Sequence, residues 1–163
     1  MIQAEIDKLR KIGFDPEKFK EYQVLCLPEN AEYAATADDL FDASGAADLS
    51  KRLKAAGLKC ANSFDLKSEA KVLERRGADL WLGLVWILDS FVTPICVGVV
   101  SALLTSMMQR RSKPAISDIQ QPEPKVHLKL RILRGEDITS IDYNGDPETL
   151  NRLLNAIGKK NRT

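Results

Sequence analysis

The stretch Leu80–Met108 reads LWLGLVWILDSFVTPICVGVVSALLTSMM, and Asp89 is its one charged residue. The 20 residues from Ser90 to Gln109 carry no charge, which is long enough for a helix to cross a bilayer. Five serines and threonines dilute the hydropathy of this run, and Pro94 stands in its first turn. We therefore expect a buried helix of a globular protein, with a membrane span as the alternative.

The charges around this run also argue against a span. Arg110, Arg111 and Lys113 would hold the C-terminal end of the helix in the cytoplasm by the positive-inside rule. The charged first half of the chain would then have to cross the membrane, although it does not begin with the basic and apolar segments of a secretory signal. We expect a cytoplasmic location, and a membrane location is the alternative.

In the soluble interpretation, residues 80–88 form a buried strand or a short helix, and residues 93–111 form one long apolar helix. Gly98, Ala102 and Ser106 recur every four residues and line one side of that helix, where another backbone can approach closely. This small-residue stripe packs either beneath the C-terminal hairpin or against a helix of another chain. The candidate interface residues are the stripe and two aromatic anchors: Trp81, Trp86, Gly98, Ala102 and Ser106.

The composition of the 163-residue chain is ordinary for a folded protein, with 44% hydrophobic residues and 29% charged residues. Its 24 Lys and Arg against 23 Asp and Glu give a formal net charge of +1. The charges are divided along the chain, because residues 1–79 are acidic on balance and residues 109–163 are basic. The near-neutral total gives no strong nucleic-acid signal, since phosphate binding needs clustered positive charge.

The first half of the chain shows alternating helix and strand signals. Apolar spacing predicts helices near residues 2–12 and 46–56, and strands at residues 22–27 and 58–61. Asp15 followed by Pro16 predicts a further helical turn, and Thr36 ahead of Asp39 predicts another short helix. Asp65 should cap a helix that carries Leu66, Ala70 and Leu73 and ends at Gly77.

Three prolines between residues 114 and 124 predict an extended linker, which divides the chain into a region at 1–113 and a unit at 125–163. The second unit starts with a clean alternation that predicts a strand from Val126 to Leu133, with His127, Lys129 and Arg131 on its solvated face. A turn, a returning strand and a leucine-rich helix after Asp146-Pro147 complete a ββα unit packed on the first region. The expected fold class is α+β: helices with a small mixed sheet, a long apolar helix near 93–111, and a C-terminal β-hairpin followed by a helix.

No pattern of chemistry-bearing residues points to an enzyme. His127 is the one histidine, and the carboxylates of Asp38, Asp39 and Asp42 are typical of a solvated helix start. The basic side chains of the hairpin, Lys125 and Arg134 among them, have no interleaved aromatic residues. Cys26, Cys60 and Cys96 have no metal-ligand spacing and read as reduced, buried thiols. We expect no catalytic residue, no cofactor and no metal.

The order of elements from residue 80 to 158 resembles the effector-associated constant component family. The resemblance rests on an apolar helix ending in Arg110-Arg111, a linker, a basic strand, a second strand and a short leucine-rich helix. It is one of layout and carries no diagnostic motif. The resemblance implies a small non-enzymatic module of bacterial conflict and antiphage systems, which couples effectors to sensing partners.

These observations lead to a first hypothesis and an alternative. The first is a non-catalytic protein–protein interaction module, an adaptor or accessory subunit of a bacterial multi-protein system for antiviral defence. It would bind a protein partner, or associate with itself to form an oligomer, through the apolar helix. The alternative is a membrane-associated protein, or effector, whose helix at 90–109 inserts into the bilayer.

Overall fold

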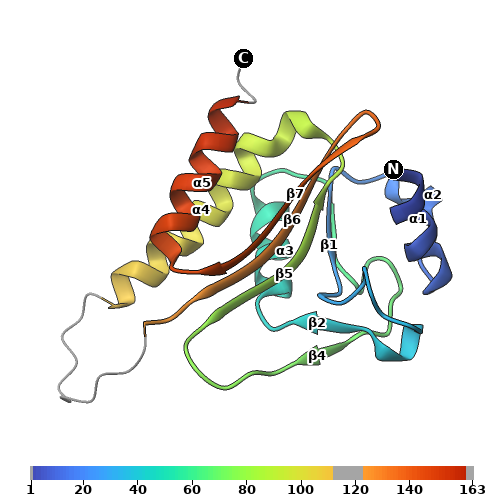
Figure 1. Ribbon diagram of the computed structural model, residues 1–163, viewed down its shortest axis with the longest axis horizontal. Helices are drawn as coiled ribbons and strands as arrows, with labels where there is room; N and C mark the ends of the chain where they lie inside the picture. The colour runs from blue at the N-terminus through green and yellow to red at the C-terminus, as the bar shows by residue number, and fades with distance from the viewer. Residues whose placement is uncertain (1, 112–122, 161–163) are drawn as a thin grey trace.

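The computed structural model describes residues 2–111 and 123–160. Within them lie five helices and a mixed five-stranded sheet of order β3-β1-β5-β6-β7, which confirms the α+β class (Figure 1). The strands of this sheet are β1 (Val24–Leu27), β3 (Cys60–Ala61), β5 (Leu80–Ile87), β6 (Val126–Arg134) and β7 (Asp137–Gly145). A small parallel sheet pairs β2 (Phe41–Ala43) with β4 (Lys71–Leu73). The helices are α1 (Ile2–Lys11), α2 (Pro16–Phe19), α3 (Ala46–Ala55), α4 (Thr93–Arg111) and α5 (Pro147–Lys160).

Strand β5 is the central strand, and its apolar sequence follows from that position. It runs antiparallel to β1 and parallel to β6, so neighbouring strands cover both of its edges. Its six residues from Leu82 to Ile87 are buried, as a strand covered on both faces requires. The open choice between a strand and a short helix at this run is therefore resolved as a strand.

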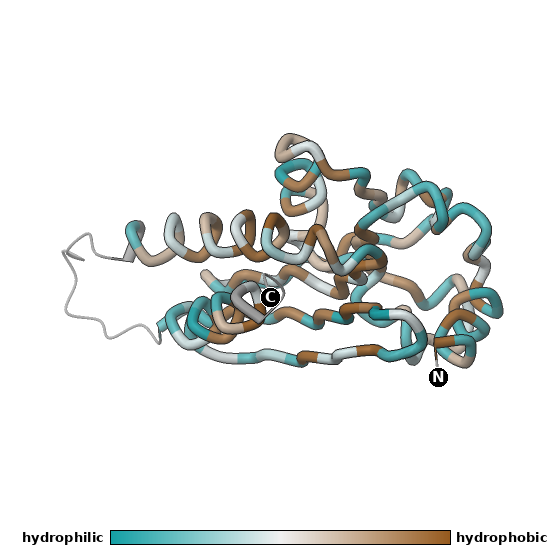
Figure 2. Tube along the Cα trace, turned by 90° about the horizontal axis from the view of Figure 1, so that it is seen from above, coloured by the Kyte–Doolittle hydropathy of each residue, from teal (hydrophilic) through white to brown (hydrophobic). Residues whose placement is uncertain are grey.

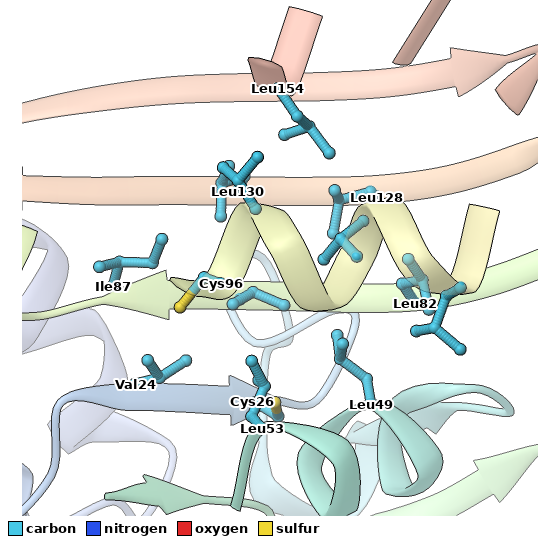
Figure 3. Packing of buried hydrophobic residues seen from close by; sticks show 14 of the residues in the cluster. Val24, Cys26, Leu49, Leu53, Leu82, Ile87, Cys96, Leu128, Leu130 and Leu154 are labelled. Carbon is cyan, nitrogen blue, oxygen red and sulfur yellow. The ribbon is translucent and has the colours of Figure 1, made fainter. Parts of the chain in front are cut away.

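One face of the sheet is covered by α3, α4 and α5. Alternate residues of the strands point to this face, where they meet apolar side chains of the three helices (Figure 3). Figure 3 shows this layering. Leu128 and Leu130 of β6 and Cys26 of β1 lie near α4, and α4 runs between α3 and α5. This face holds the larger of the two apolar clusters.

The opposite face is apolar on one half and polar on the other. Beneath α1 and α2 it presents Leu25 and Leu27 of β1 with Leu84 and Trp86 of β5. Farther along the sheet, β6 presents His127, Lys129 and Arg131, which alternate with its buried leucines. The basic strand thus supplies apolar side chains to the helix-covered face and charged side chains to the other face.

The C-terminal unit is built into the sheet. Strand β6 lies between β5 and β7, so the ββα unit that we expected to pack on the first region instead continues its sheet. The strand, the hairpin turn and the helix after Asp146 are confirmed, and Asp146 Oδ2 accepts a hydrogen bond from Thr149 N at 2.8 Å. Residues 114–122 of the predicted linker lie outside the described residues.

One helix prediction in the first half is wrong, and another is confirmed only as a short 3₁₀ helix. Asp65 does not cap a helix, because its carboxylate accepts hydrogen bonds from Asn62 N and from Lys54 Nζ, and the chain there forms turns before β4. The capping signal at Thr36 leads only into a single 3₁₀ turn, η1 (Ala37–Asp39), which gives way to β2. At Asp65 the side chains of Asp65 and Asn62 bond to local backbone N–H groups, which competes with helix formation.

Candidate functional site

Helix α4 begins after a side-chain cap and runs for 19 residues, as the sequence predicted. Asp89 Oδ1 accepts a hydrogen bond from Phe91 N at 3.1 Å and starts the 3₁₀ turn η2 (Ser90–Val92) that leads into the helix. Pro94 falls in the first turn, where its missing N–H leaves no bond unmade. In Figure 2 the helix is brown to white along most of its length.

The buried side of α4 is apolar except for Thr93 at its start, and it joins the core. Val97, Val100 and Leu104 pack in the main cluster, and α5 comes close enough that a Cβ on Gly158 would contact Val97 at 3.8 Å. This side anchors the helix, and it leaves the opposite side facing away from the sheet.

That opposite side is uncharged and exposed, and we call it the open face of α4. Phe91 is 91% exposed and Ile95 is 45% exposed. A Cβ added to Gly98 would have nothing within 4 Å. The spacing of three and four residues places the members from Ile95 onward on one side of the helix, and Phe91 lies just before the helix, in η2. The open face comprises Phe91, Ile95, Gly98, Ala102, Thr105 and Ser106.

The structure thus places the predicted small-residue stripe on the surface. Gly98, Ala102 and Ser106 are all exposed and do not pack beneath the C-terminal hairpin, so the intramolecular alternative is wrong. Sequence reasoning missed Phe91 and Ile95, although counting back from Gly98 in steps of three and four reaches both. These two side chains are the large apolar residues of the open face.

The two predicted aromatic anchors do not join this face. Trp86 is 1% exposed and belongs to the cluster beneath α1 and α2, so it is a core residue and the prediction of a surface anchor is wrong. Trp81 is half-buried on the polar half of the sheet, where it stacks on His127. Both tryptophan side chains leave β5 on the face opposite α4, because the register shift between Trp81 and Gly83 interrupts the alternation of the strand.

The polar half of the sheet is tied down by its own side chains. His127 Nε2 lies 3.0 Å from Asp79 Oδ2, and His127 Nδ1 lies 2.7 Å from Asn144 Oδ1. The hydrogen bond from His127, followed by one from Lys125 N, holds the pKa of Asp79 below its usual value. We had expected this histidine to lie on a solvated face. It is instead engaged with protein groups.

Arg131 is still more enclosed, at 8% exposure. Its guanidinium donates to both carboxylate oxygens of Glu32, at 2.9 and 2.7 Å, and to Asp142 Oδ1 at 2.7 Å. Lys129 Nζ lies over the ring of Tyr33, 4.9 Å from its centroid. The expectation of a solvated strand face is therefore wrong for this strand, because the loop after β1 folds over it.

The other candidates for chemistry stay apart. Asp42 accepts a hydrogen bond from Ser63, and Asp39 accepts one from Thr36. The three cysteines are free and buried, with Cys26 Sγ 3.8 Å from Cys60 Sγ. Within residues 2–111 and 123–160, no group of three His, Cys, Asp or Glu side chains could hold a metal ion.

The run Ser90–Gln109 also meets the length and hydropathy criteria of a membrane span, with a mean hydropathy of 1.9. Of its most apolar window, 39% is buried within the protein. A core helix of a soluble protein passes the same test, so the two interpretations differ in what covers the open face.

No protein-family model, curated protein or solved structure matches this chain. The resemblance to the effector-associated constant component family accordingly stays a prediction drawn from layout.

Proposed function

We propose that this protein is a non-catalytic interaction module, an adaptor or accessory subunit, that docks an apolar helix of a protein partner on the open face of α4. The observation that carries the proposal is the exposure of an uncharged helix side that includes Phe91 and Ile95. Exposed apolar patches of this kind are typical of interaction sites on soluble proteins. The antiviral setting rests on the layout resemblance alone.

The open face suits a helix as its occupant. Gly98, Ala102 and Ser106 form a shallow track in which no side chain keeps a second backbone away. Phe91 and Ile95, at the start of the track, supply side chains whose full burial is worth about 1.5–3 kcal/mol each. Since the face carries no charge, docking desolvates no ion.

The test uses the tagged full-length chain, isolated from its own cells, and measures the mass of the complex by light scattering. We expect a partner at fixed stoichiometry, its loss on Ala102→Leu or Gly98→Leu, and its retention on Ala156→Leu. Ala156 is an exposed alanine of α5, so the control adds the same side chain to another helix. An unchanged complex mass in both α4 variants would contradict the proposal.

The uncharged length of α4 supports one alternative, insertion of the helix into a bilayer. Fractionation distinguishes the two, because an inserted protein stays with membranes through carbonate extraction. A docking module is instead recovered without detergent. Carbonate-resistant pelleting of the wild-type chain that Ala102→Leu does not change would favour insertion over docking.

A further inference from the structure

Strand β7 forms one edge of the five-stranded sheet. It pairs with β6 through nine consecutive residues, from Asp137 opposite Arg134 to Gly145 opposite Val126, and no bulge interrupts the register. In the part of the chain that the structure describes, no strand pairs with its other side. The outer edge of β7 therefore offers a long, regular row of backbone donors and acceptors.

This edge lacks most of the features that usually keep sheet edges from pairing, and its only charged residues are Asp137 and Asp142. Such edges are commonly short, bulged, or interrupted by proline or lysine. The sequence of β7 is DITSIDYNG, without proline and without a basic residue. The opposite edge of the sheet is β3, which has only two residues and so is protected by its shortness.

We infer that β7 pairs with β7 of a second copy of this chain, antiparallel, to make one sheet continuous through both copies. A two-fold axis at Ile141, the middle residue of β7, brings all nine residues of each strand into register. It keeps inward residues opposite inward residues, so the helices of both copies cover the same face of the joined sheet.

The side chains of β7 complement one another in this register. Ile141 lies opposite Ile141 of the second copy, and Thr139 lies opposite Tyr143, a favourable β-branched and aromatic pair. Ser140 lies opposite Asp142, to which its hydroxyl can donate. Asp137 lies opposite Gly145. No like charges face each other within the strands, and the first such pair, Glu136 with Asp146, falls beyond their ends.

Charge and length together select this register over its neighbours. Moving the axis to Asp142 would place that carboxylate opposite itself, which destabilises a strand pair. Moving the axis to Ser140 would leave Asn144 and Gly145 without partners in the strand. The symmetric arrangement at Ile141 is the one that pairs the whole strand.

The test compares two isosteric variants of the exposed residue Ser140 in the full-length chain. Ser140→Asp places a carboxylate opposite Asp142 twice in each dimer, whereas Ser140→Asn places a neutral group of the same size there. Sedimentation equilibrium should give a wild-type dimer, a dissociation constant raised about tenfold by Ser140→Asp, and a small change for Ser140→Asn. The effect of Ser140→Asp should shrink as salt is raised.

A second measurement reports where the copies meet. Amide hydrogen exchange of residues 137–145 should slow as protein concentration rises, while exchange in β1 should not change. A monomer at every concentration, or equal weakening by both Ser140 variants, would overturn the inference. A dimer that Ala102→Leu abolishes and Ser140→Asp leaves intact would also overturn it, because the copies would then meet at the open face of α4.

Discussion

Trp81 and His127 lie face to face across β5 and β6, with ring centroids 3.5 Å apart and planes 8° from parallel. The guanidinium of Arg75 lies 3.6 Å from the centroid of the same tryptophan, and Arg75 also pairs with Glu29. This stack joins the two parallel strands to the loop that precedes β5. The one histidine of the chain therefore makes contacts that hold the sheet together.

Asp79→Asn should weaken the fold and change how stability depends on pH. Asp79 bonds to His127 and to Lys125 N, and these contacts hold the pKa of its carboxyl below the ordinary value of about 3.9. Its contribution is therefore present above pH ~4 and is lost as pH falls through the lowered pKa. Because the side chain is partly exposed, we expect a loss of about 1 kcal/mol at pH 7 in urea unfolding.

The control for that prediction is Asp38→Asn, which removes an exposed carboxylate from η1. It should leave the free energy of unfolding within about 0.5 kcal/mol of the wild type. If the two variants show the same dependence on pH between 2 and 7, the contact between Asp79 and His127 contributes nothing to stability.

Arg131→Met should destabilise the protein by about 2–3 kcal/mol, because it leaves the half-buried Glu32 carboxylate without its partner. The double variant Glu32→Gln with Arg131→Met should be more stable than Arg131→Met alone, since it removes the unpaired charge. Urea unfolding of the two single variants and the double variant measures this coupling. Strict additivity of the three values would show that the pair does not interact.

Gly45 and Gly98 should respond to alanine in opposite directions. A Cβ on Gly45 would collide with the carbonyl oxygen of Trp81, which accepts a hydrogen bond from Gly45 N at 2.8 Å, so Gly45→Ala should cost about 1–3 kcal/mol. A Cβ on Gly98 meets nothing, so Gly98→Ala should raise helix stability by about 1 kcal/mol. Thermal unfolding of both variants measures the difference, and equal shifts would contradict it.

Cys26 and Cys60 should stay reduced although their sulfurs are in contact. Cys60 pairs with Val24 in the parallel register, so it is offset by two residues from Cys26. That offset puts the two Cα atoms roughly 8 Å apart, beyond the usual disulfide limit of about 7 Å. Treatment of the folded chain with diamide, followed by alkylation in denaturant and mass spectrometry, should find three alkylated cysteines.

The reactivity of Cys96 tests how firmly α4 packs on the sheet. Burial raises the pKa of Cys96 to about 12, so this thiol has almost no thiolate at pH 8. We expect slow labelling by iodoacetamide at pH 8 until urea unfolds the protein. Rapid labelling of Cys96 in the folded chain would mean that α4 separates from the sheet in solution.

Much of the secondary structure could be predicted because it is written in local patterns. Unbroken alternation marks β6, the uncharged run of 20 residues marks α4, and the pair Asp146-Pro147 marks the start of α5. The helix expected after Asp65 failed because its carboxylate bonds to Asn62 and Lys54, and Lys54 lies in α3. A capping signal cannot reveal a partner 11 residues away.

The candidate site was only partly accessible from the sequence. Spacing placed Gly98, Ala102 and Ser106 on one side of α4, but it could not say whether that side met the sheet or solvent, because neither side of the run to Gln109 carries a charge. The same limit applies to the tryptophans, since Trp81 and Trp86 are alike in the sequence and leave the same face of β5, and only the elements that cover that face bury one more than the other.

By itself the sequence determined the α+β class, the position and length of the apolar helix, and the alternation that gives β6 one apolar and one charged face. Tertiary structure alone decided that β6 enters the sheet beside β5, that Arg131 meets Glu32 from a distant loop, and that the small-residue side of α4 remains uncovered. The physical reason is that periodicity is set by backbone geometry within one element, whereas burial depends on which elements the folded chain brings together.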